Sequence, residues 1–234
     1  MAGSIRALDW ASTPLGPVAT WPQSLRTSVS ICLDCAFPIV LWWGPQLAIL
    51  YNDEYIRILG SAKHPNALGQ PCADVWTEIW DVIQPMLAQV MDRGEATRSR
   101  DLQLLMNREG YLEETYFSFS YSPIYDEGGK VGGVFCPCIE TTEKVVGERR
   151  LVTLRDLAAQ CKGSDSERGV YQAAAKVLAA NSHDIPFALI YRITEDASAE
   201  LDAVAGIEPG TSSAAPRRVV LDGPPDPWGL AEVV

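Results

Sequence analysis

The segment Val131–Thr142 reads VGGVFCPCIETT and joins a strand to a helix with no turn between them. Its mostly apolar run from Val131 to Ile139 predicts a strand buried on at least one face. From Thr142 to about Cys161 we expect a helix, because apolar side chains recur there at the 3-4-3 spacing of one helix face: Leu151, Leu154, Ala158 and Cys161. Glu140, Thr141 and Thr142 lie where the two elements meet, and are the predicted relay between them.

Two further strands are predicted just before this segment. Arg98–Met106 leads through a turn into Tyr111–Pro123, and a second turn, Asp126–Gly129, leads on to Val131. Side chains alternate between the faces of a strand. The middle strand therefore presents two sets on opposite faces: Tyr116, Ser118 and Ser120 on one, and Phe117, Phe119 and Tyr121 on the other.

Upstream, two short apolar runs are split by Gly-Pro-Gln and predict a β-hairpin over residues 38–51. A short helix over Glu54–Leu59, a loop and a helix from about Ala73 to Arg93 follow, with Pro85 expected to kink the last one. Two strands, helices and three antiparallel strands indicate an α+β fold. Residues 1–36 contain turns and one packing helix, and form an N-terminal helical cap.

Downstream, Ser164-Asp165-Ser166-Glu167 is a capping box that predicts a helix over Glu167–Ala180. Two strands, Ile185–Ile193 and Leu201–Ile207, are expected next, and the tail from Pro209 does not close a domain. The second domain therefore looks incomplete.

Composition narrows the classes of function. With 47% hydrophobic residues among 234, the chain can bury a core. Its net charge of −11 argues against nucleic acid or an anionic membrane as partner, because like charges repel. Since neither a membrane-spanning run nor a secretory signal is visible, we expect a cytoplasmic protein.

Several local motifs carry a family resemblance. They are Trp42-Trp43-Gly44, Leu50-Tyr51-Asn52-Asp53, His64-Pro65-x-x-Leu68-Gly69, Val75-Trp76-x-Glu78-Ile79-Trp80 and the closing Glu140-Thr141-Thr142, where the family usually has Asp-x-Thr. Residues 37–145 resemble a PAS domain, of the kind found at the front of bacterial hybrid histidine kinases. Residues 146–163 resemble the connector helix to a following GAF domain, and residues 164–234 resemble the first part of that domain.

The resemblance implies a five-stranded antiparallel sheet with helices on one face, and a sensory role ahead of kinase output domains. The pocket between sheet and helices would hold a small molecule. The candidates to line it are Trp42, Tyr55, Trp76, Ile79, Trp80, Tyr116, Ser118 and Phe135. The same aromatic side chains would serve equally well to fill a core without any ligand.

The cysteines suggest more specialised functional hypotheses. Cys72 follows Gly69 at the spacing of the photoreactive cysteine in LOV domains, a flavin-binding branch of PAS, and could have a lowered thiol pKa near a helix start. The arginine and asparagine that flank that cysteine in LOV domains are missing here. The pairs Cys32/Cys35 and Cys136/Cys138 leave a metal or redox site open beside simple burial.

No catalytic set of residues and no metal-binding motif is visible, so this part of a protein is expected to regulate and not to catalyse. The leading hypothesis is a small-molecule sensor that relays a shift of the sheet through the relay residues into the helix. Its rivals are a flavin or other cofactor sensor and a ligand-free dimerisation scaffold. The face of Leu151, Leu154, Ala158 and Cys161 is the predicted seam of a homodimer.

Overall fold

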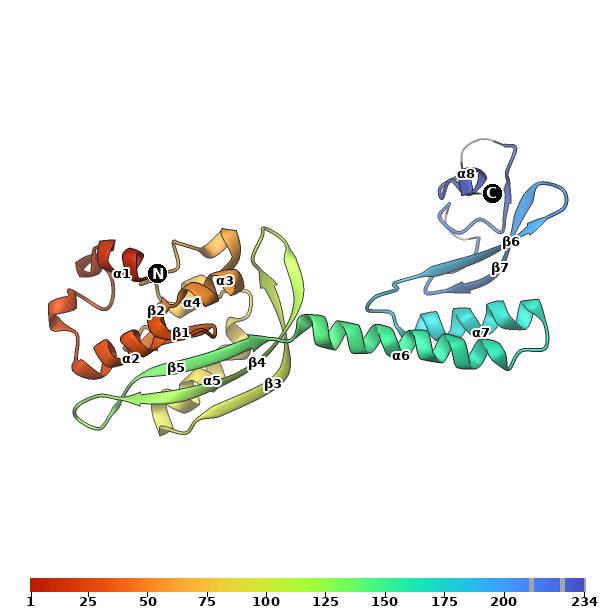
Figure 1. Cartoon of the computed structure of the whole chain (residues 1–234). Helices are drawn as coiled ribbons and strands as arrows, with labels where there is room; N and C mark the ends of the chain where they lie inside the picture. Colours follow the sequence, from red (N-terminus) through yellow and green to blue (C-terminus); the bar gives the residue numbers. More distant parts are fainter. Residues whose placement is uncertain (211–212, 224–225, 234) are drawn as a thin grey trace. The chain divides into compact units, whose positions relative to one another are not determined.

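The computed structural model describes residues 1–210, 213–223 and 226–233, which divide into two compact units, Met1–Val145 and Val146–Val234 (Figure 1). Each unit is described by itself below. The first contains the large hydrophobic core, and the second is a smaller helix-and-sheet unit.

The first unit is built on a five-stranded antiparallel sheet in the order β2-β1-β5-β4-β3 (Figure 1). Its strands are β1 (Ile39–Trp43), β2 (Ala48–Tyr51), β3 (Thr97–Asn107), β4 (Leu112–Tyr125) and β5 (Val131–Glu140). The predicted pairs of two and three strands are present, and β5 joins them by lying between β1 and β4. The predicted five-stranded antiparallel sheet is confirmed.

Directly opposed residues of paired strands share a face, so the register assigns each side chain to one of two faces. Trp42 opposes Val134, Phe119 opposes Cys138, and Leu104 opposes Thr115. These residues define the inner face, which the helices between β2 and β3 cover. The outer face carries Leu41 and Phe135 in register, and Ser118 opposite Ile139.

Helices η3 (Asp53–Tyr55), α3 (Ile56–Lys63), α4 (Cys72–Val75) and α5 (Trp80–Arg93) cover the inner face (Figure 1). In α5 the buried residues Ile83, Leu87 and Val90 recur at helical spacing and face the sheet. The single helix predicted from Ala73 is in fact two, separated by Trp76–Ile79. Pro85 lies within α5, so the chain breaks before α5 and not at the proline.

The segment before β1 forms α1 (Ala2–Ala7), η1 (Trp10–Ser12), η2 (Val18–Thr20) and α2 (Gln23–Asp34). Leu41 and Leu50 oppose each other on the outer face and are fully buried, so that face needs a cover at this end. The helix α2 contacts β1 and β2, and its Cys32 sulfur lies 3.7 Å from the Ile39 carbonyl oxygen. The helices between β2 and β3 thus lie on one face of the sheet, as predicted for the PAS domain, and α2 of the N-terminal cap covers part of the other face because β1 and β2 are apolar on both sides.

Asn52 fixes the chain where β2 turns into the inner helices. Its side-chain oxygen accepts hydrogen bonds from the backbone amides of Ile39 and Tyr55, both at 3.1 Å. Its side-chain nitrogen donates to the carbonyls of Cys35 and Phe37, at 3.0 and 2.7 Å. A buried amide that satisfies four backbone groups holds η3, and with it Tyr55, in one position.

The helix α6 (Thr142–Lys162) follows β5, and the second unit then holds α7 (Glu167–Ala180), β6 (Ala188–Thr194), β7 (Ser198–Ala205), β8 (Arg218–Val220) and α8 (Leu230–Val233). The bounds of α7 are as predicted, but its N-cap is Ser166, whose hydroxyl accepts the amide of Gly169 at 3.1 Å, and not Ser164 of the predicted capping box. The strands pair antiparallel in the order β6-β7-β8. The short strand β8 is not predicted from the sequence, and part of the predicted tail lies outside the described residues.

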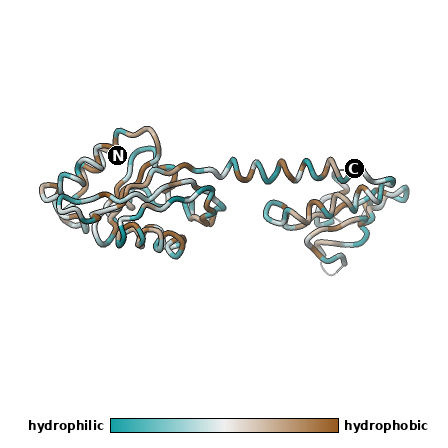
Figure 2. Tube along the Cα trace, turned by 90° about the horizontal axis from the view of Figure 1, so that it is seen from below, coloured by the Kyte–Doolittle hydropathy of each residue, from teal (hydrophilic) through white to brown (hydrophobic). Residues whose placement is uncertain are grey.

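Hydrophobic residues are spread in short runs along the chain, with polar residues between them along α6 (Figure 2). None of the helices in the described ranges is long and apolar enough to cross a membrane.

Candidate ligand cavity and its link to helix α6

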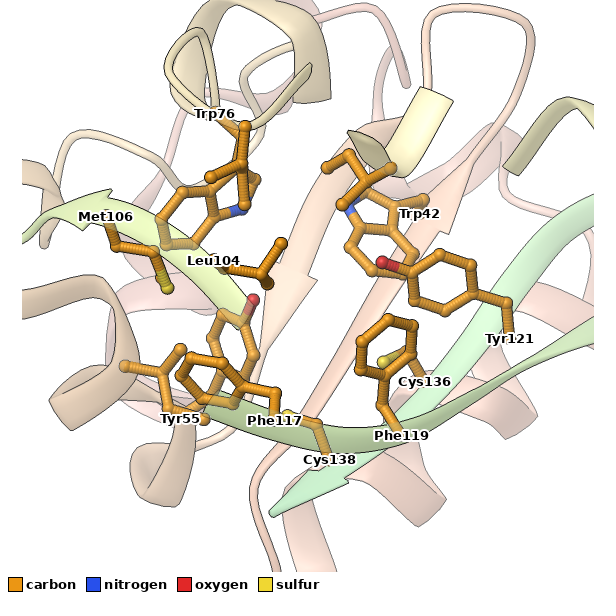
Figure 3. A pocket seen from close by; sticks show the side chains of 13 residues that line it. Trp42, Tyr55, Trp76, Leu104, Met106, Phe117, Phe119, Tyr121, Cys136 and Cys138 are labelled. Atoms are coloured by element: carbon orange, nitrogen blue, oxygen red, sulfur yellow. The ribbon is translucent and has the colours of Figure 1, made fainter. Parts of the chain in front are cut away.

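A cavity of about 40 Å³ lies between the inner face of the sheet and the helices α3 to α5 (Figure 3). Its walls are aromatic and aliphatic, with two thiols at one side. The lining residues are Trp42, Tyr55, Ile58, Trp76, Ile79, Ile83, Leu104, Met106, Phe117, Phe119, Tyr121, Cys136 and Cys138.

Four of the eight predicted pocket residues line this cavity. Trp42 comes from β1, Tyr55 from η3, and Trp76 and Ile79 from the break between α4 and α5. Trp76 follows α4 directly and Ile79 directly precedes α5, and both side chains lie over the sheet.

The other four predicted residues lie elsewhere, so the prediction is wrong for them. The sequence predicts Tyr116 and Ser118 at the pocket, whereas the neighbouring residues Phe117 and Phe119 are the ones that line the cavity. Ser118 and Phe135 line a groove on the outer face, together with Pro137 and Ile139. In a strand a shift of one residue exchanges the two faces.

Trp80 is the first residue of α5 and lies in a surface groove beside Gln46 and Leu47. It does not reach the cavity because the break at Trp76–Ile79 resets the helical phase.

Sequence reasoning missed nine lining residues: Ile58, Ile83, Leu104, Met106, Phe117, Phe119, Tyr121, Cys136 and Cys138. A usable sign for those on β4 was that Phe117, Phe119 and Tyr121 are more apolar as a set than Tyr116, Ser118 and Ser120. The more apolar face of an alternating strand is the one that packs on the core.

The polar groups at the cavity are two indole N–H groups and two phenol hydroxyls. Figure 3 shows the nitrogens of Trp42 and Trp76 and the oxygens of Tyr55 and Tyr121 on the cavity side of their rings. Burial raises the pKa of Tyr55 and Tyr121 well above the usual value, and the neighbouring thiols add to the shift. Both phenols are therefore neutral and available as hydrogen-bond donors at neutral pH.

Trp76 is held in place by a nearby ion pair. The Lys63 ammonium lies 4.8 Å from the centre of the Trp76 ring, donates to the Val75 carbonyl at 2.7 Å and pairs with Glu78 at 3.0 Å. Glu78 also accepts the amide of Asn107 at 2.9 Å. These contacts tie the break between α4 and α5 to the end of β3.

The relay residues lie at the junction of β5 and α6. Glu140 accepts hydrogen bonds from the Thr142 hydroxyl at 2.8 Å and from the Arg108 guanidinium at 2.9 Å. The amide of Thr141 donates to the Tyr116 carbonyl at 2.7 Å, and the Tyr116 amide donates to the Thr142 hydroxyl at 3.0 Å. Tyr116 therefore holds the start of α6, while its neighbour Phe117 lines the cavity.

The comparisons with known proteins identify this unit. A family model described as PAS fold matches residues 39–146. Residues 39–146 form a PAS domain. No curated protein matches the chain.

Among solved structures, an RNA-binding light-oxygen-voltage receptor is 17% identical, with a TM-score of 0.41 over 65% of this chain. This chain spans 43% of that receptor's length. The LOV protein of Rhodobacter sphaeroides is 12% identical, with a TM-score of 0.43 over 66% of this chain and 90% of that one. A sensory box sensor histidine kinase from Vibrio cholerae is 16% identical, with a TM-score of 0.34 over 50% and 88%. Similarity at this level assigns no ligand or activity to the chain.

A flavin does not fit the PAS cavity in this structure. An apolar cavity needs about 150 Å³ to hold a single benzene ring, and a flavin has three fused rings. The cavity here is about 40 Å³. Cys72, the candidate for a flavin-reactive thiol, is also absent from the residues that line it.

Cys72 is fully buried at the start of α4, a helix of four residues. Burial raises the pKa of its thiol far above the usual value, and the indole N–H of Trp42 opposes this only in part. The prediction of a reactive Cys72 is therefore wrong: the desolvation of a thiolate outweighs the weak field of so short a helix.

The remaining cysteines are also free thiols. Burial raises the pKa of Cys136 strongly, and the neighbouring Cys138 raises it further. Within the described part of the chain, no group of three or more cysteine, histidine or acidic side chains could hold a metal ion.

Along α6 the predicted seam residues Leu151, Leu154 and Ala158 are exposed, and the two leucines are 66% and 61% exposed. Cys161 differs from them, since its thiol contacts the Val170 carbonyl of α7 at 3.9 Å and is partly covered.

Proposed function

We propose that this chain is the sensory input region of a bacterial signal-transduction protein, a cytoplasmic two-component sensor histidine kinase. In this proposal a small molecule enters the PAS cavity and shifts the inner face of the sheet. The shift reaches α6 through Glu140, Thr141 and Thr142, and α6 passes it to the GAF-like region of residues 164–234 and to the kinase domains of the parent protein. The chain itself regulates and does not catalyse.

The observation that carries this proposal is the shared strand between cavity and junction. Phe117 touches the cavity, and the adjacent Tyr116 uses its carbonyl to accept the amide of Thr141 and its amide to donate to the Thr142 hydroxyl. On β5, Cys138 lines the cavity two residues before Glu140. A ligand that moves the inner face of β4 or β5 therefore acts within one or two residues of the bonds that orient α6.

Such coupling requires that occupancy of the cavity favours one arrangement of the junction over another. Xenon is a suitable probe because it fills a small cavity without any hydrogen bond. In amide NMR spectra recorded under xenon pressure, we expect shifts for Ile58 and Leu104 in the wall, and also for Thr141, Thr142 and Val145 at the junction.

The variant Thr142→Val removes the hydroxyl that bonds Tyr116 and Glu140 but keeps the side-chain shape. It should keep the xenon shifts in the cavity and lose most of those beyond Thr142. The matched control is Thr27→Val in α2, whose hydroxyl only accepts from Gln23 at 3.1 Å. Cavity shifts without junction shifts in the unmodified protein would contradict the relay.

A ligand-free dimerisation scaffold is the second candidate, favoured by the small volume of the cavity and by the exposed Leu151 and Leu154. It predicts a homodimer that the double variant Leu151→Glu, Leu154→Glu dissociates, as measured by light scattering after size-exclusion chromatography. Val152→Glu is the control, since Val152 is 47% exposed on the same helix but off the seam. Loss of the dimer together with an absent xenon response would replace the sensor by the scaffold.

A further inference from the structure

The seven tryptophans of the chain fall into groups that differ in what their indole N–H groups bond. Trp10, Trp21 and Trp228 each donate to a backbone carbonyl, at 2.6, 3.1 and 2.8 Å. Trp42 and Trp76 are buried at least as deeply as these, at 2% and 1% exposed. Both nevertheless turn their N–H groups toward the PAS cavity (Figure 3).

The N–H of Trp42 has no hydrogen-bond partner among the described residues. The Cys72 sulfur lies close enough to interact with it, but a thiol is a weak acceptor and makes no well-formed hydrogen bond here. A buried donor left without an acceptor costs about 1–3 kcal/mol, so native proteins rarely leave one. Such a group aimed into a cavity points to an acceptor that a bound molecule supplies.

The phenols strengthen this reading. Tyr121 extends its hydroxyl from β4 toward Trp42, whose ring it meets edge-on with 5.1 Å between centres (Figure 3). Tyr55 extends its hydroxyl from η3 on the opposite side. Four donors from β1, β4, η3 and the break before α5 thus converge on one small space.

The chemistry of the walls limits what can fill that space. No charged, carboxylate, amide or imidazole group is among the lining residues. An ion would lose its hydration without gaining a counter-charge, which is strongly unfavourable. A purely apolar molecule would leave the donors unsatisfied. Because an apolar cavity that holds benzene has about 150 Å³, a cavity of about 40 Å³ admits only a molecule smaller than a benzene ring.

We propose that the PAS cavity binds a small, neutral molecule whose oxygen accepts hydrogen bonds, of the carbonyl class, and that Trp42 and Trp76 are its principal donors. Tyr55 and Tyr121 complete the donor set. This inference rests on the proposed function, since it names the class of ligand for the same cavity.

Three probes of nearly one shape test the ligand class. Acetone carries the acceptor, isobutene has the same skeleton without it, and acetate adds a charge. In spectra of the ¹⁵N-labelled chain, acetone should shift the indole N–H signals of Trp42 and Trp76 in a saturable manner. The signals of Trp10 and Trp21, which already have carbonyl partners, serve as internal controls and should stay in place.

Variants then connect the affinity to each donor. Trp42→Phe and Trp76→Phe remove an N–H and also enlarge the cavity, so each should weaken acetone binding about fivefold relative to isobutene binding, the value of one neutral hydrogen bond. Tyr55→Phe and Tyr121→Phe remove only a hydroxyl and give the same test with little risk to folding. Well-dispersed spectra establish that each variant is folded.

The possible failures are separable. Isobutene or acetate binding as tightly as acetone overturns the donor-based inference but leaves a ligand-binding sensor intact. Equal shifts of all the indole signals mark a solvent effect and also overturn it, as does ordered water that acetone does not displace. If neither acetone nor xenon perturbs the cavity residues, the inference and the proposed sensory function fall together.

Discussion

The cavity and the junction of β5 with α6 are built on the same two strands but treat their polar groups in opposite ways. At the cavity, the N–H groups of Trp42 and Trp76 lie on the cavity side of their rings, and that of Trp42 has no partner among the described residues. At the junction, Arg108 bridges Glu113 at 2.7 Å and Glu140 at 2.9 Å, and Glu140 in turn holds Thr142. The cavity thus leaves a neutral donor without a partner, whereas the charged groups of the junction pair with one another. The Thr141 hydroxyl and one oxygen of Glu113 are nevertheless buried at the junction without a hydrogen-bond partner among the described residues.

That difference matches what each region needs in a sensor. A recognition site gains specificity from donors that only the ligand can satisfy. A relay needs hydrogen bonds and ion pairs that hold the start of α6 in one arrangement. A shift of the strand then breaks or re-forms a defined set of these bonds. The comparison predicts that substitutions in the two regions will separate stability, binding and the behaviour of α6.

The apolar wall of the cavity should dominate stability. Phe119 is 7% exposed and stacks on Tyr121 with 4.7 Å between ring centres. Phe119→Ala enlarges the existing cavity and should lower the free energy of unfolding by about 3–4 kcal/mol. Ser120→Ala, the next residue and on the outer face, loses the hydrogen bond from its hydroxyl to the Thr97 carbonyl at 3.1 Å and should lower it by about 1 kcal/mol. Urea titration of both variants measures the two free energies of unfolding. Similar losses for the two variants would show that the two faces do not differ in their contribution to stability.

Substitutions at the junction should have the second-largest effect on stability, because the charged groups there are only partly buried. Arg108→Met leaves Glu113 and Glu140 without their cation, and their side chains are 18% and 29% exposed. We expect the free energy of unfolding to fall by about 2 kcal/mol, a value between those of surface and buried ion pairs. Amide exchange at Thr142 and Val145 should become faster.

The matched control for Arg108 is Arg155→Met. Arg155 is 71% exposed and pairs only with its neighbour Asp156 on α6. Its loss should cost less than about 0.5 kcal/mol in urea titration. Equal costs for the two arginines would show that Arg108 does not hold the junction.

The inner-face tyrosines should make stability fall at high pH. Burial raises the pKa of Tyr51 to about 12, and that of Tyr55 and Tyr121 well above the usual value of about 10. A raised pKa means that the neutral form is favoured in the folded state. The stabilisation is complete below about pH 10 and is lost as the pH rises through the folded-state values.

After a jump to high pH, tyrosinate absorbance should therefore rise in two phases. The buried tyrosines ionise only as the protein unfolds and belong to the slow phase. Tyr121→Phe should therefore reduce the slow amplitude. A single fast phase for all tyrosines would show that the cavity is open to hydroxide.

Much of this fold could be predicted from the sequence because its patterns are local. The strand over Val131–Ile139, the helix from Thr142 and the capped helix Glu167–Ala180 each follow from periodicity and caps in one stretch of chain. The α+β order and the PAS resemblance followed from those elements. The cover of the outer face by α2 did not follow from local patterns. Distant parts of the chain decide whether β1 is buried on one face or on both.

The candidate site was harder to predict for the same physical reason. Trp42 and Trp76 could be chosen because large aromatics in this order resemble a pocket wall. The choice between Ser118 and Phe119 depended on the register of β4 against β5, and a shift of one residue exchanges the faces. The break at Trp76–Ile79 leaves Trp76 at the cavity and Trp80 in a surface groove. Its Glu78 pairs with Lys63, a residue that lies outside the local pattern.

Among the substitutions in the two regions, Ser118→Ala should have the smallest effect on stability. It should also separate the two roles most clearly, because it should change α6 without changing ligand binding. The Ser118 hydroxyl accepts the amide of Asp101 at 3.0 Å, and Asp101 holds Lys144 of α6 at 3.1 Å. Asp101 has a φ of 48°, an uncommon conformation that these bonds help to maintain. Ser118→Ala should cost less than about 1 kcal/mol and speed amide exchange in the first turn of α6 about twofold to fivefold.

Because Ser118 lies on the outer face, its loss should leave the affinity for acetone unchanged. Tyr121→Phe should do the reverse, weakening acetone about fivefold without altering exchange in α6 when no probe is present. Titration and exchange on the two variants complete the test. If Ser118→Ala weakened acetone as much as Tyr121→Phe, the two faces would act as one site, and the cavity and the relay could no longer be treated as separate regions.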